Sequence, residues 1–492
     1  MIPGNDSARS LIDYLSHWES TSPNRPFASD GTGASYSYAE TATAVRALSA
    51  ELGRLGVRAG DRAVILAENS APWIVAFLAG LASGLIVVPL TTRLTTDELD
   101  VLLDDADPGV IAVDSALLPV VGGRWRDRTM LLSDPLPVGA SVSRPIDGDA
   151  PACLTYTSGT TSRPKGVLLS NVGLTRASET YAALFHSTPA MHTVVAVPLC
   201  HNTGFVDQLG HVLVAGGSIE AHRRFRADEI ARQLHTGECT YFIGVPTMYH
   251  RIVEHLTDIS PCERDPWLAF GGAPMPSQLI VRLHDHFPHS HLVNCYGLSE
   301  ATSITHVNFV TPGSTATEVG VAVAGTIDRI SPSGELLIRS PTAMLGYYGD
   351  PGATVAKFEN GWLRTGDLAA RADDGMVQVF GRVDDVINRG GEKVVPLEVE
   401  EALCAHPSVV EAAVVGLPDV QYGSIVAAAV VTSEPIALHD LARFLEGSLA
   451  DYKRPTQMVG VDELPRNQNG KVVPGDVRDL INRLLNGFDV RP

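Results

Sequence analysis

The sequence predicts an α/β protein in which a large N-terminal domain is followed by a small α+β domain. Up to Tyr296, short apolar runs alternate with amphipathic stretches. Strands separated by helices of this length indicate right-handed βαβ units and doubly wound parallel sheets. After Tyr296 the pattern changes to short strand-like pieces between turns, and past Asp384 a compact α+β pattern begins. The length of 492 residues agrees, because it exceeds what one hydrophobic core usually supports.

The N-terminal part contains one stretch that is long enough to cross a membrane. Residues 73–90 carry no charge and just reach transmembrane length. Small residues and Pro89 divide the stretch, however, and residues 85–88 are rich in β-branched side chains. We therefore expect a buried helix followed by a buried parallel strand. The same patterns predict strands at 194–197 and 241–245 and helices at 207–214, 227–234 and 278–286.

The last third of the chain predicts two smaller units. Strand-like ranges at 319–327, 334–339 and 375–380 indicate a small antiparallel β-barrel or sheet that completes the large domain. Beyond it we expect helices at 397–405 and 438–449 and strands at 411–415 and 425–431. The predicted domains are therefore residues 1–383 and residues 384–492.

Composition excludes several classes of function. A formal net charge of −19 argues against a nucleic acid partner, whose binding depends on clustered Lys and Arg. The six cysteines form no C-x-x-C pair, which favours reduced, mostly buried thiols over a disulfide framework or a zinc site. The first residues lack the basic start and apolar core of a signal peptide. We expect a cytoplasmic protein without a membrane partner.

The loop at residues 155–166 is the most informative segment. It combines hydroxyl side chains with Gly159, Gly166 and a single lysine, Lys165. Glycine lets the backbone approach an anion closely, and hydroxyl and ammonium groups add donors, so the loop suits a polyphosphate. It is not a Walker A loop, because Pro164 precedes the lysine where glycine is required. Alone, such a loop is more often a flexible connection.

Further motifs follow in a fixed order. They are Tyr-Gly-Leu-Ser-Glu at 296–300, Gly-Trp-Leu-Arg-Thr-Gly-Asp at 361–367, Gly-Arg-Val-Asp-Asp at 381–385, Gly-Gly-Glu-Lys at 390–393, Pro-Leu-Glu-Val-Glu at 396–400 and Pro-Arg-Asn-Gln-Asn-Gly-Lys at 465–471. With the loop at 155–166, the set resembles the adenylate-forming (ANL) superfamily, most closely its acyl- and aryl-CoA synthetases. The resemblance covers nearly the whole chain. It implies that ATP and Mg²⁺ activate a carboxylic acid and that coenzyme A accepts the acyl group.

The resemblance also implies which residues bind ATP. Tyr296 would stack on adenine, Asp367 would accept hydrogen bonds from the ribose hydroxyls, and Arg382 would lie against the ribose or a phosphate. Ser162 departs from the commonest family form, which has glycine there. Each of these residues, taken alone, is equally compatible with a turn or a solvated loop. The full expected set is Thr157, Ser158, Gly159, Thr160, Thr161, Lys165, Gly272, Ala273, Tyr296, Gly297, Ser299, Asp367 and Arg382.

Two residues are expected to serve the chemistry of the phosphates. Glu300 follows a predicted parallel strand, where ligands of open α/β sheets gather, and a carboxylate suits Mg²⁺ that also contacts phosphates. An isolated glutamate there would otherwise be a surface residue. Lys471 lies in a polar loop, where position alone predicts a solvated side chain. Its match to the family's catalytic-lysine loop instead implies that it bridges the substrate carboxylate and the α-phosphate.

The second half-reaction requires another geometry. The resemblance implies a hinge at Asp384, about which the C-terminal domain rotates to withdraw Lys471. Gly390 and Gly391 would then line a narrow tunnel for the pantetheine arm of coenzyme A. Glycines before a strand are also ordinary turn formers, so both interpretations stay open.

The acyl pocket is predicted by position relative to the motifs. His201 would lie near the substrate carboxylate, although a histidine after a strand is as often structural. An aspartate that binds an α-amino group in peptide synthetases is replaced by His201-Asn202. The remaining candidates are small or uncharged, which suits an aryl, alicyclic or medium-chain acid. They are Asn202, Val245, Met248, Gly271, Gly297, Ala301 and Ser303.

Two other functions remain open. A freestanding adenylation enzyme would load a carrier protein instead of coenzyme A, although only a short segment follows Lys471 and we expect no carrier domain there. A binding protein without activity is a further possibility, but the presence of Lys165, Glu300, Asp367 and Lys471 argues against it. A homodimer is common among soluble enzymes, and the sequence does not decide it.

Overall fold

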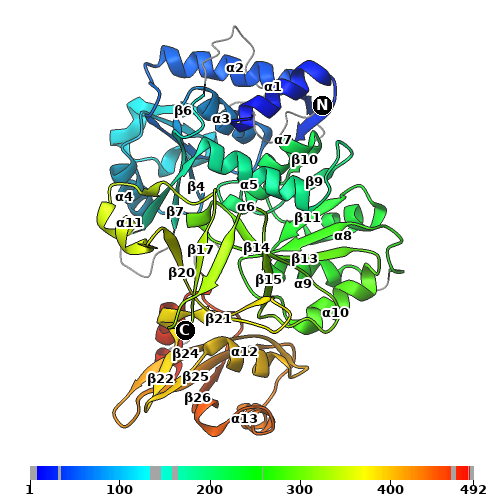
Figure 1. Cartoon of the computed structure of the whole chain (residues 1–492), viewed down its shortest axis with the longest axis vertical. Coiled ribbons are helices and arrows are strands. Elements are labelled where there is room, and N and C mark those ends of the chain that lie inside the picture. The colour runs from blue at the N-terminus through cyan, green and yellow to red at the C-terminus, as the bar shows by residue number, and fades with distance from the viewer. Residues whose placement is uncertain are drawn as a thin grey trace.

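The computed structural model describes residues 8–30, 35–132, 146–157, 164–257, 259–466, 472–485 and 487. Figure 1 shows a large body built from two sheets with flanking helices, and a small body below it that contains the last part of the chain. The last helix of the described residues, α14 (Pro474–Leu485), lies beside the junction of the two bodies (Figure 1).

The first sheet has seven strands. Its central pairs β3–β4, β3–β5, β4–β7 and β5–β6 are parallel, and β7–β8 is an antiparallel hairpin. In spatial order the strands are β18 (Gly346–Tyr347), β8 (Lys165–Ser170), β7 (Pro151–Thr157), β4 (Ile86–Leu90), β3 (Arg62–Leu66), β5 (Val110–Val113) and β6 (Thr129–Leu131). The hairpin places Lys165 at the edge where the phosphate loop is expected.

The second sheet has 14 strands and contains both a parallel and an antiparallel part. Strands β10, β9, β11, β12 and β13 are parallel, and pairing turns antiparallel from β13 to β14. In spatial order the strands are β16 (Ile327–Ile330), β17 (Glu335–Arg339), β20 (Trp362–Arg371), β21 (Val377–Arg382), β15 (Glu318–Ala322), β14 (Ile304–Phe309), β13 (His291–Gly297), β12 (Trp267–Phe270), β11 (Tyr241–Gly244), β9 (His192–Val195), β10 (Ser218–Ala221), β1 (Pro26–Ser29) and β2 (Ser35–Ser37), with β19 (Phe358–Glu359) paired to β20. The strands expected as a small barrel or sheet are hydrogen-bonded to the large sheet through β14 and β15, so the sheet alternative describes them.

Helices cover these sheets, and local sequence explains several of their ends. Ser10, Ser37 and Thr95 each accept a hydrogen bond from the first turn of a helix and complete a capping box. The helices are α1 (Leu11–Thr21), α2 (Tyr38–Arg54), α3 (Ala71–Ala82), α4 (Thr96–Ala106), α5 (Asn171–Leu184), α6 (Asn202–Gly204), α7 (His211–Ala215), α8 (Ala227–Thr236), α9 (Pro246–Glu254), α10 (Ser277–His286) and α11 (Pro351–Lys357), with the short turns η1 (Ser115–Val120), η2 (Gly123–Arg128), the π-helical η3 (Phe205–Gly210) and η4 (Ser299–Ala301). The prediction for residues 73–90 is confirmed, since α3 is buried and leads into the buried strand β4.

The small body has its own hydrophobic cores. Its strands are β22 (Ile387–Arg389), β23 (Glu392–Val394), β24 (Val409–Asp419), β25 (Gly423–Thr432) and β26 (Gln457–Gly460), and its helices are α12 (Pro396–Cys404), α13 (Leu438–Leu445), α14 and the turn η6 (Asp451–Lys453). Two clusters of buried side chains, drawn from residues 387–481, pack on the faces of β24 and β25. The turn η5 (Val383–Asp385) connects these clusters to the large core.

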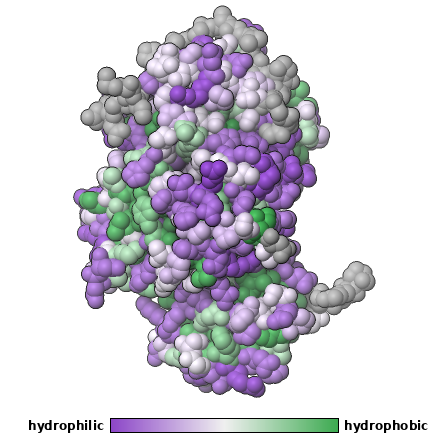
Figure 2. Space-filling model, turned by 90° about the vertical axis from the view of Figure 1, so that its right-hand side faces the viewer, coloured by the Kyte–Doolittle hydropathy of each residue, from purple (hydrophilic) through white to green (hydrophobic). Residues whose placement is uncertain are grey.

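The outer surface is chemically mixed. Figure 2 shows hydrophilic side chains over most of one face, interrupted by smaller apolar patches. All six cysteines are free, and five of them are buried. Within the described ranges, no helix combines the length and the hydropathy needed to cross a membrane.

Candidate active site

Three predicted nucleotide-binding residues meet at the end of β13. The phenol of Tyr296 donates a hydrogen bond of 2.5 Å to Oδ2 of Asp367. Arg382 donates one of 3.1 Å to Oδ1 of the same carboxylate. The antiparallel register of β20 and β21 causes this meeting, because it places Asp367 directly opposite Arg382. One carboxylate therefore joins two sheet strands to the end of β13.

The electrostatics of this group favour a charged, polar site. The Asp367 side chain is 11% exposed, whereas half of the Arg382 side chain is exposed. Burial lowers the pKa of Arg382, but the nearby carboxylates, Asp367 first and then Glu300, outweigh it and raise that pKa overall. Burial and the nearby Asp367 raise the pKa of Tyr296. The guanidinium therefore stays charged and the phenol stays a neutral donor.

Glu300 lies in the turn η4 and has two partners that the sequence did not reveal. Tyr347 donates a hydrogen bond of 2.7 Å to Oε1 of Glu300, and Nζ of Lys357 lies 3.2 Å from the same oxygen. Lys165 continues the group, because its Nζ lies 5.3 Å from the centre of the Tyr347 ring. Burial opposes ionisation of Glu300, but Lys357 and the hydrogen bond from Tyr347 lower its pKa overall. Glu300 is therefore an ionised, hard oxygen donor of the kind that Mg²⁺ binds.

Close backbone approach fixes the turn that carries Glu300. A Cβ atom at Gly297 would lie only 1.9 Å from the carbonyl oxygen of Ser303, so no side chain fits there. Thr302 adopts a φ of 69°, which is rare for a β-branched residue. Its hydroxyl donates a hydrogen bond of 2.6 Å to the carbonyl oxygen of Thr342. Such strain persists only where surrounding contacts hold it, and it is often found at functional sites.

The segment expected beside the purine follows β12. Gly272 has a φ of 78°, and both Gly272 and Ala273 are exposed. Gly271 has a packing reason of its own, because a Cβ atom there would lie 2.6 Å from the carbonyl oxygen of Cys295 on β13. Glycine at position 271 is therefore required by the sheet, whether or not it also borders an acyl group.

Several predicted acyl-pocket residues also converge. The side-chain nitrogen Nδ2 of Asn202, at the start of α6, donates a hydrogen bond to the carbonyl oxygen of Thr302. This contact brings His201 and Asn202 next to the segment that holds the buried Ala301 and Ser303. On the next strands along the sheet, β11 and β12 are paired in register, so Val245 and Gly271 leave the same sheet edge. Met248 lies in the first turn of α9 and is buried.

A buried carboxylate behind this region was missed. Asp207 lies in η3, and its Oδ1 accepts a hydrogen bond from the hydroxyl of Ser303. Burial raises the pKa of Asp207 to about 7, against hydrogen bonds from Ser303, Tyr181 and Thr203 that lower it. A signal was present in the sequence, because an acidic residue inside an apolar helical stretch is seldom fully buried without a function or a partner.

Parts of the expected site lie outside the described residues. These are Ser158, Gly159, Thr160, Thr161, Ser162 and the expected catalytic Lys471. Thr157 and Lys165, which flank the loop, face each other in the β7–β8 register. Arg466 and Val472, which flank the segment of Lys471, form an antiparallel bridge.

The expected hinge and tunnel residues belong to the small body and the turn before it. Asp384 is exposed in η5. Gly390 and Gly391 form the turn between β22 and β23, with φ values of 62° and 100°. The Gly390 N–H donates to the carbonyl oxygen of Tyr422, and a Cβ atom at Gly391 would have no neighbour within 4 Å. The structure does not bring these glycines into contact with Asp367 or Glu300.

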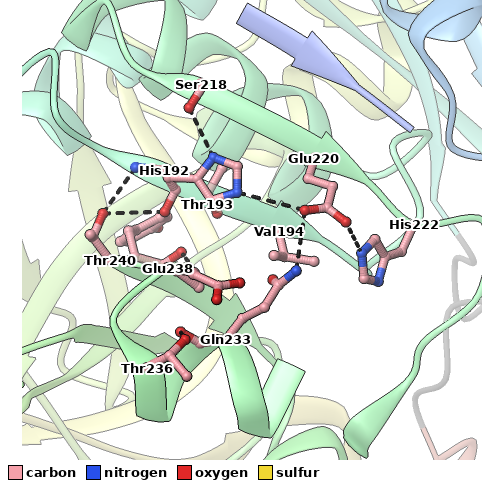
Figure 3. Close-up of polar contacts among 12 residues, drawn as sticks. His192, Thr193, Val194, Ser218, Glu220, His222, Gln233, Thr236, Glu238 and Thr240 are labelled. Carbon is pink, nitrogen blue, oxygen red and sulfur yellow. Dashed lines mark hydrogen bonds and ion pairs between the residues drawn. The ribbon is translucent and has the colours of Figure 1, made fainter. Parts of the chain in front are cut away.

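A separate ionisable group lies on β9, β10 and α8 (Figure 3). Glu220 is hydrogen-bonded to His222 at 2.7 Å and lies 3.8 Å from His192. Hydrogen bonds from these two histidines hold the pKa of Glu220 well below its usual range. Glu229 comes close enough to share an ion with Glu220 and His222, but it pairs with Arg226 at 3.0 Å. Glu220 and Glu229 therefore each have a partner among the neighbouring side chains.

Comparison with known proteins decides the family. The model of the AMP-binding enzyme family matches residues 15–348, and that of the AMP-binding enzyme C-terminal domain matches residues 398–471. The chain belongs to the AMP-binding enzyme family. A feruloyl-CoA synthase from Amycolatopsis sp is 31% identical over 470 residues, covering 91% of this chain and 94% of that protein. An oxalate–CoA ligase from Arabidopsis thaliana is 30% identical over 465 residues, with coverage of 87% and 90%.

A solved member of this AMP-binding enzyme family has the same fold. The o-succinylbenzoate coenzyme A synthetase from Bacillus subtilis, in complex with ATP and magnesium ion, superposes with a TM-score of 0.84 at 27% identity. The match covers 95% of this chain and 99% of that one. The expected adenylate-forming family and its α/β fold are thereby confirmed.

Proposed function

We propose that the residues gathered at the end of β13 bind ATP and Mg²⁺ for the two steps of an acid–CoA ligase. The chain is an AMP-forming acid–CoA ligase, like the curated family members that match nearly its full length. A carboxylate attacks the α-phosphate of ATP, giving acyl-AMP and pyrophosphate. The thiol of coenzyme A then attacks the acyl carbon, giving the thioester and AMP. The observation that carries the residue assignment is the Asp367 carboxylate held between Tyr296 and Arg382.

The assignment of ATP contacts follows from donor and acceptor chemistry. Asp367 accepts hydrogen bonds from the ribose hydroxyls, because one carboxylate can serve a vicinal diol. Arg382 is charged and half exposed, and it faces the ribose or a phosphate. Lys165, Gly159 and the hydroxyl groups of residues 157, 158, 160 and 161 contact the β- and γ-phosphates. Gly272 and Ala273 border adenine opposite Tyr296, and Ser299 contacts the phosphate side.

Glu300 is assigned to Mg²⁺. Its ionised carboxylate fits a hard cation that keeps most of its other ligands as phosphate oxygens and water. When bound, Mg²⁺ neutralises phosphate charge during attack on the α-phosphate. Lys357 and Tyr347 hold Glu300 in position and keep it ionised.

The division of labour between domains is part of the proposal. We assign residues 1–383 to the adenylation core and residues 384–492 to a mobile domain that carries Lys471. Separate hydrophobic cores on either side of η5, and the exposed position of Asp384, support this division. Lys471 stabilises charge in the first step, and rotation about Asp384 brings Gly390 and Gly391 toward the acyl-adenylate for the second.

The acyl group is assigned to the region between His201, Asn202 and residues 301–303. Small and uncharged side chains there support an aryl, alicyclic or medium-chain acid. Family members named for oxalate and for ferulate differ greatly in acyl size, so the family alone does not select among these classes. We retain coenzyme A over a carrier protein as acceptor. A homodimer and a cytoplasmic location stay predictions; the six free cysteines support the latter.

The experiment separates the two half-reactions. In Gly391→Leu we expect adenylate formation, measured by pyrophosphate exchange, to persist while thioester formation is lost. Gly423→Leu is the matched control, since Gly423 also has positive φ and open space and lies in the neighbouring hairpin. Lys471→Ala should show the reverse pattern and still convert preformed acyl-AMP. Equal loss of both steps in Gly391→Leu alone would contradict the tunnel assignment.

A further inference from the structure

Asp207 is a buried acid with an unusual setting. It lies in the π-helical turn η3, a rare conformation that is frequent at functional sites, and only 4% of it is exposed. Its carboxylate is surrounded by hydroxyl groups, from Ser303, Tyr181 and Thr203. In the described part of the chain, no basic side chain forms an ion pair with it. A buried carboxylate without a neighbouring cation is costly, so the surrounding hydroxyl groups must donate their hydrogen bonds to Asp207.

Ser303 connects this acid to the proposed acyl site. It follows Thr302, whose carbonyl oxygen accepts the hydrogen bond from Asn202. Its own backbone lies against Gly297 at the end of β13. Ser303 is 9% exposed, whereas Asp207 is 4% exposed. Asn202 and Asp207, which lie on the continuous segment α6–η3, therefore contact the neighbouring residues Thr302 and Ser303.

The direction of the Ser303 hydrogen bond decides whether Ser303 acts as a donor or as an acceptor toward the proposed acyl site. A serine hydroxyl has one proton and two lone pairs, and an ionised carboxylate can only accept. The Ser303 proton is directed to Oδ1 of Asp207. An acyl group that reaches Ser303 in the proposed acyl site would then meet lone pairs alone. Tyr181, at 3.4 Å from the Ser303 oxygen, occupies at most one of them.

We propose that Asp207 is a positioning residue that turns the Ser303 proton inward, so that the acyl pocket selects acids bearing an O–H or N–H donor. The inference rests on the proposed location of the acyl site. It names a substrate class within it: hydroxy- or amino-substituted acids over methoxy or unsubstituted analogues. An analogue without the donor leaves the serine oxygen desolvated and unpaired, and such mismatches give strong discrimination.

The burial of Asp207 makes the direction of the Ser303 hydrogen bond dependent on pH. Burial raises its pKa to about 7, so the acceptor-only form predominates above neutrality. The titratable groups that face it are Tyr181 on α5, Tyr241 on β11, His211 on α7 and Cys295 on β13. Burial raises the pKa of both tyrosines and of the thiol, and lowers that of His211 to about 3. Near neutral pH, Asp207 is therefore the group in this set that changes charge.

The test compares acids in matched pairs. The probes are hydroxy and methoxy forms of cinnamic, benzoic and phenylacetic acids, with ATP, Mg²⁺ and coenzyme A, and the readout is kcat/KM for thioester formation. For the preferred skeleton we expect the wild type to favour the hydroxy acid by about tenfold or more, increasingly so as pH rises from about 6 to about 8.5. Asp207→Asn replaces one carboxylate oxygen by an NH2 group; when this group donates to Ser303, the serine proton is free to point outward. Its ratio should fall by about tenfold or invert.

Two controls separate specificity from folding. Ser303→Ala should lower the hydroxy-to-methoxy ratio toward one. Ser178→Ala removes a buried hydroxyl that donates to Leu174 on α5, and it should leave the ratio as in the wild type. Equal use of both acids by the wild type at every pH, or an unchanged ratio in Asp207→Asn, would overturn the inference and leave the ligase assignment intact. Failure of folded wild type to form any acyl-adenylate would overturn both.

Discussion

Replacing Asp207 by asparagine should change how the stability of the large domain depends on pH. Burial raises the pKa of this carboxyl from 3.8 to about 7 in the folded protein. Between pH 3.8 and about pH 7, the carboxyl is therefore protonated in the native state and ionised in the unfolded state. Stability from this group is fully present below 3.8 and is lost as pH rises through the folded value near 7. The loss is about 1.4 kcal/mol per pH unit, or about 3 kcal/mol from pH 5 upward.

Asparagine does not titrate, so the Asp207→Asn variant lacks this pH dependence of the free energy of unfolding. The measurement is the free energy of unfolding in urea for wild type and Asp207→Asn at about pH 5 and about pH 8.5. The difference between the two proteins should move by about 3 kcal/mol in favour of Asp207→Asn at the higher pH. Asp373→Asn removes an exposed carboxylate as the control and should change stability by less than about 0.5 kcal/mol at either pH. A difference for Asp207→Asn that stays constant with pH would refute the burial argument.

Two further predictions concern the end of β13. Asp367→Ala removes the acceptor shared by Tyr296 and Arg382; because hydrogen bonds to charged groups are worth about 1.5–3 kcal/mol, steady-state kinetics should show KM for ATP raised by about 10- to 100-fold. An unchanged KM for ATP would place the nucleotide elsewhere. Gly297→Ala puts a Cβ atom 1.9 Å from the Ser303 carbonyl oxygen, and unfolding in urea should show a loss of about 1–3 kcal/mol or more. A fully stable alanine variant would contradict the close approach of the two strands.

Much of the fold could be predicted from hydrophobic periodicity. Residues 73–90, 227–234 and 241–245 were predicted in the right class because each contains a local signal: a uniform apolar run, an amphipathic face or a β-branched cluster. The helix expected at 207–214 is divided between the π-helical η3 and α7. Hydrophobic periodicity does not reveal a change of helical hydrogen bonding within one continuous helical segment.

The residues of the site could be predicted from the sequence only where they lie in a family motif. The position of Asp367 opposite Arg382 results from strand register, which the motif order implies only through family resemblance. The pair of Glu300 with Lys357 joins distant segments, and no local pattern connects them. The acidic residue inside an apolar helix was a readable signal for Asp207, but its partner Ser303 lies on another element.

The most direct test of the account is mass spectrometry of the products formed from ATP, Mg²⁺, coenzyme A and a pooled panel of aromatic, alicyclic and medium-chain acids. We expect an acyl-CoA thioester together with AMP and pyrophosphate, and a lower yield of these products from Asp367→Ala when ATP is below its KM. Acyl-adenylate that accumulates without a coenzyme A thioester, or ADP in place of AMP, would contradict it.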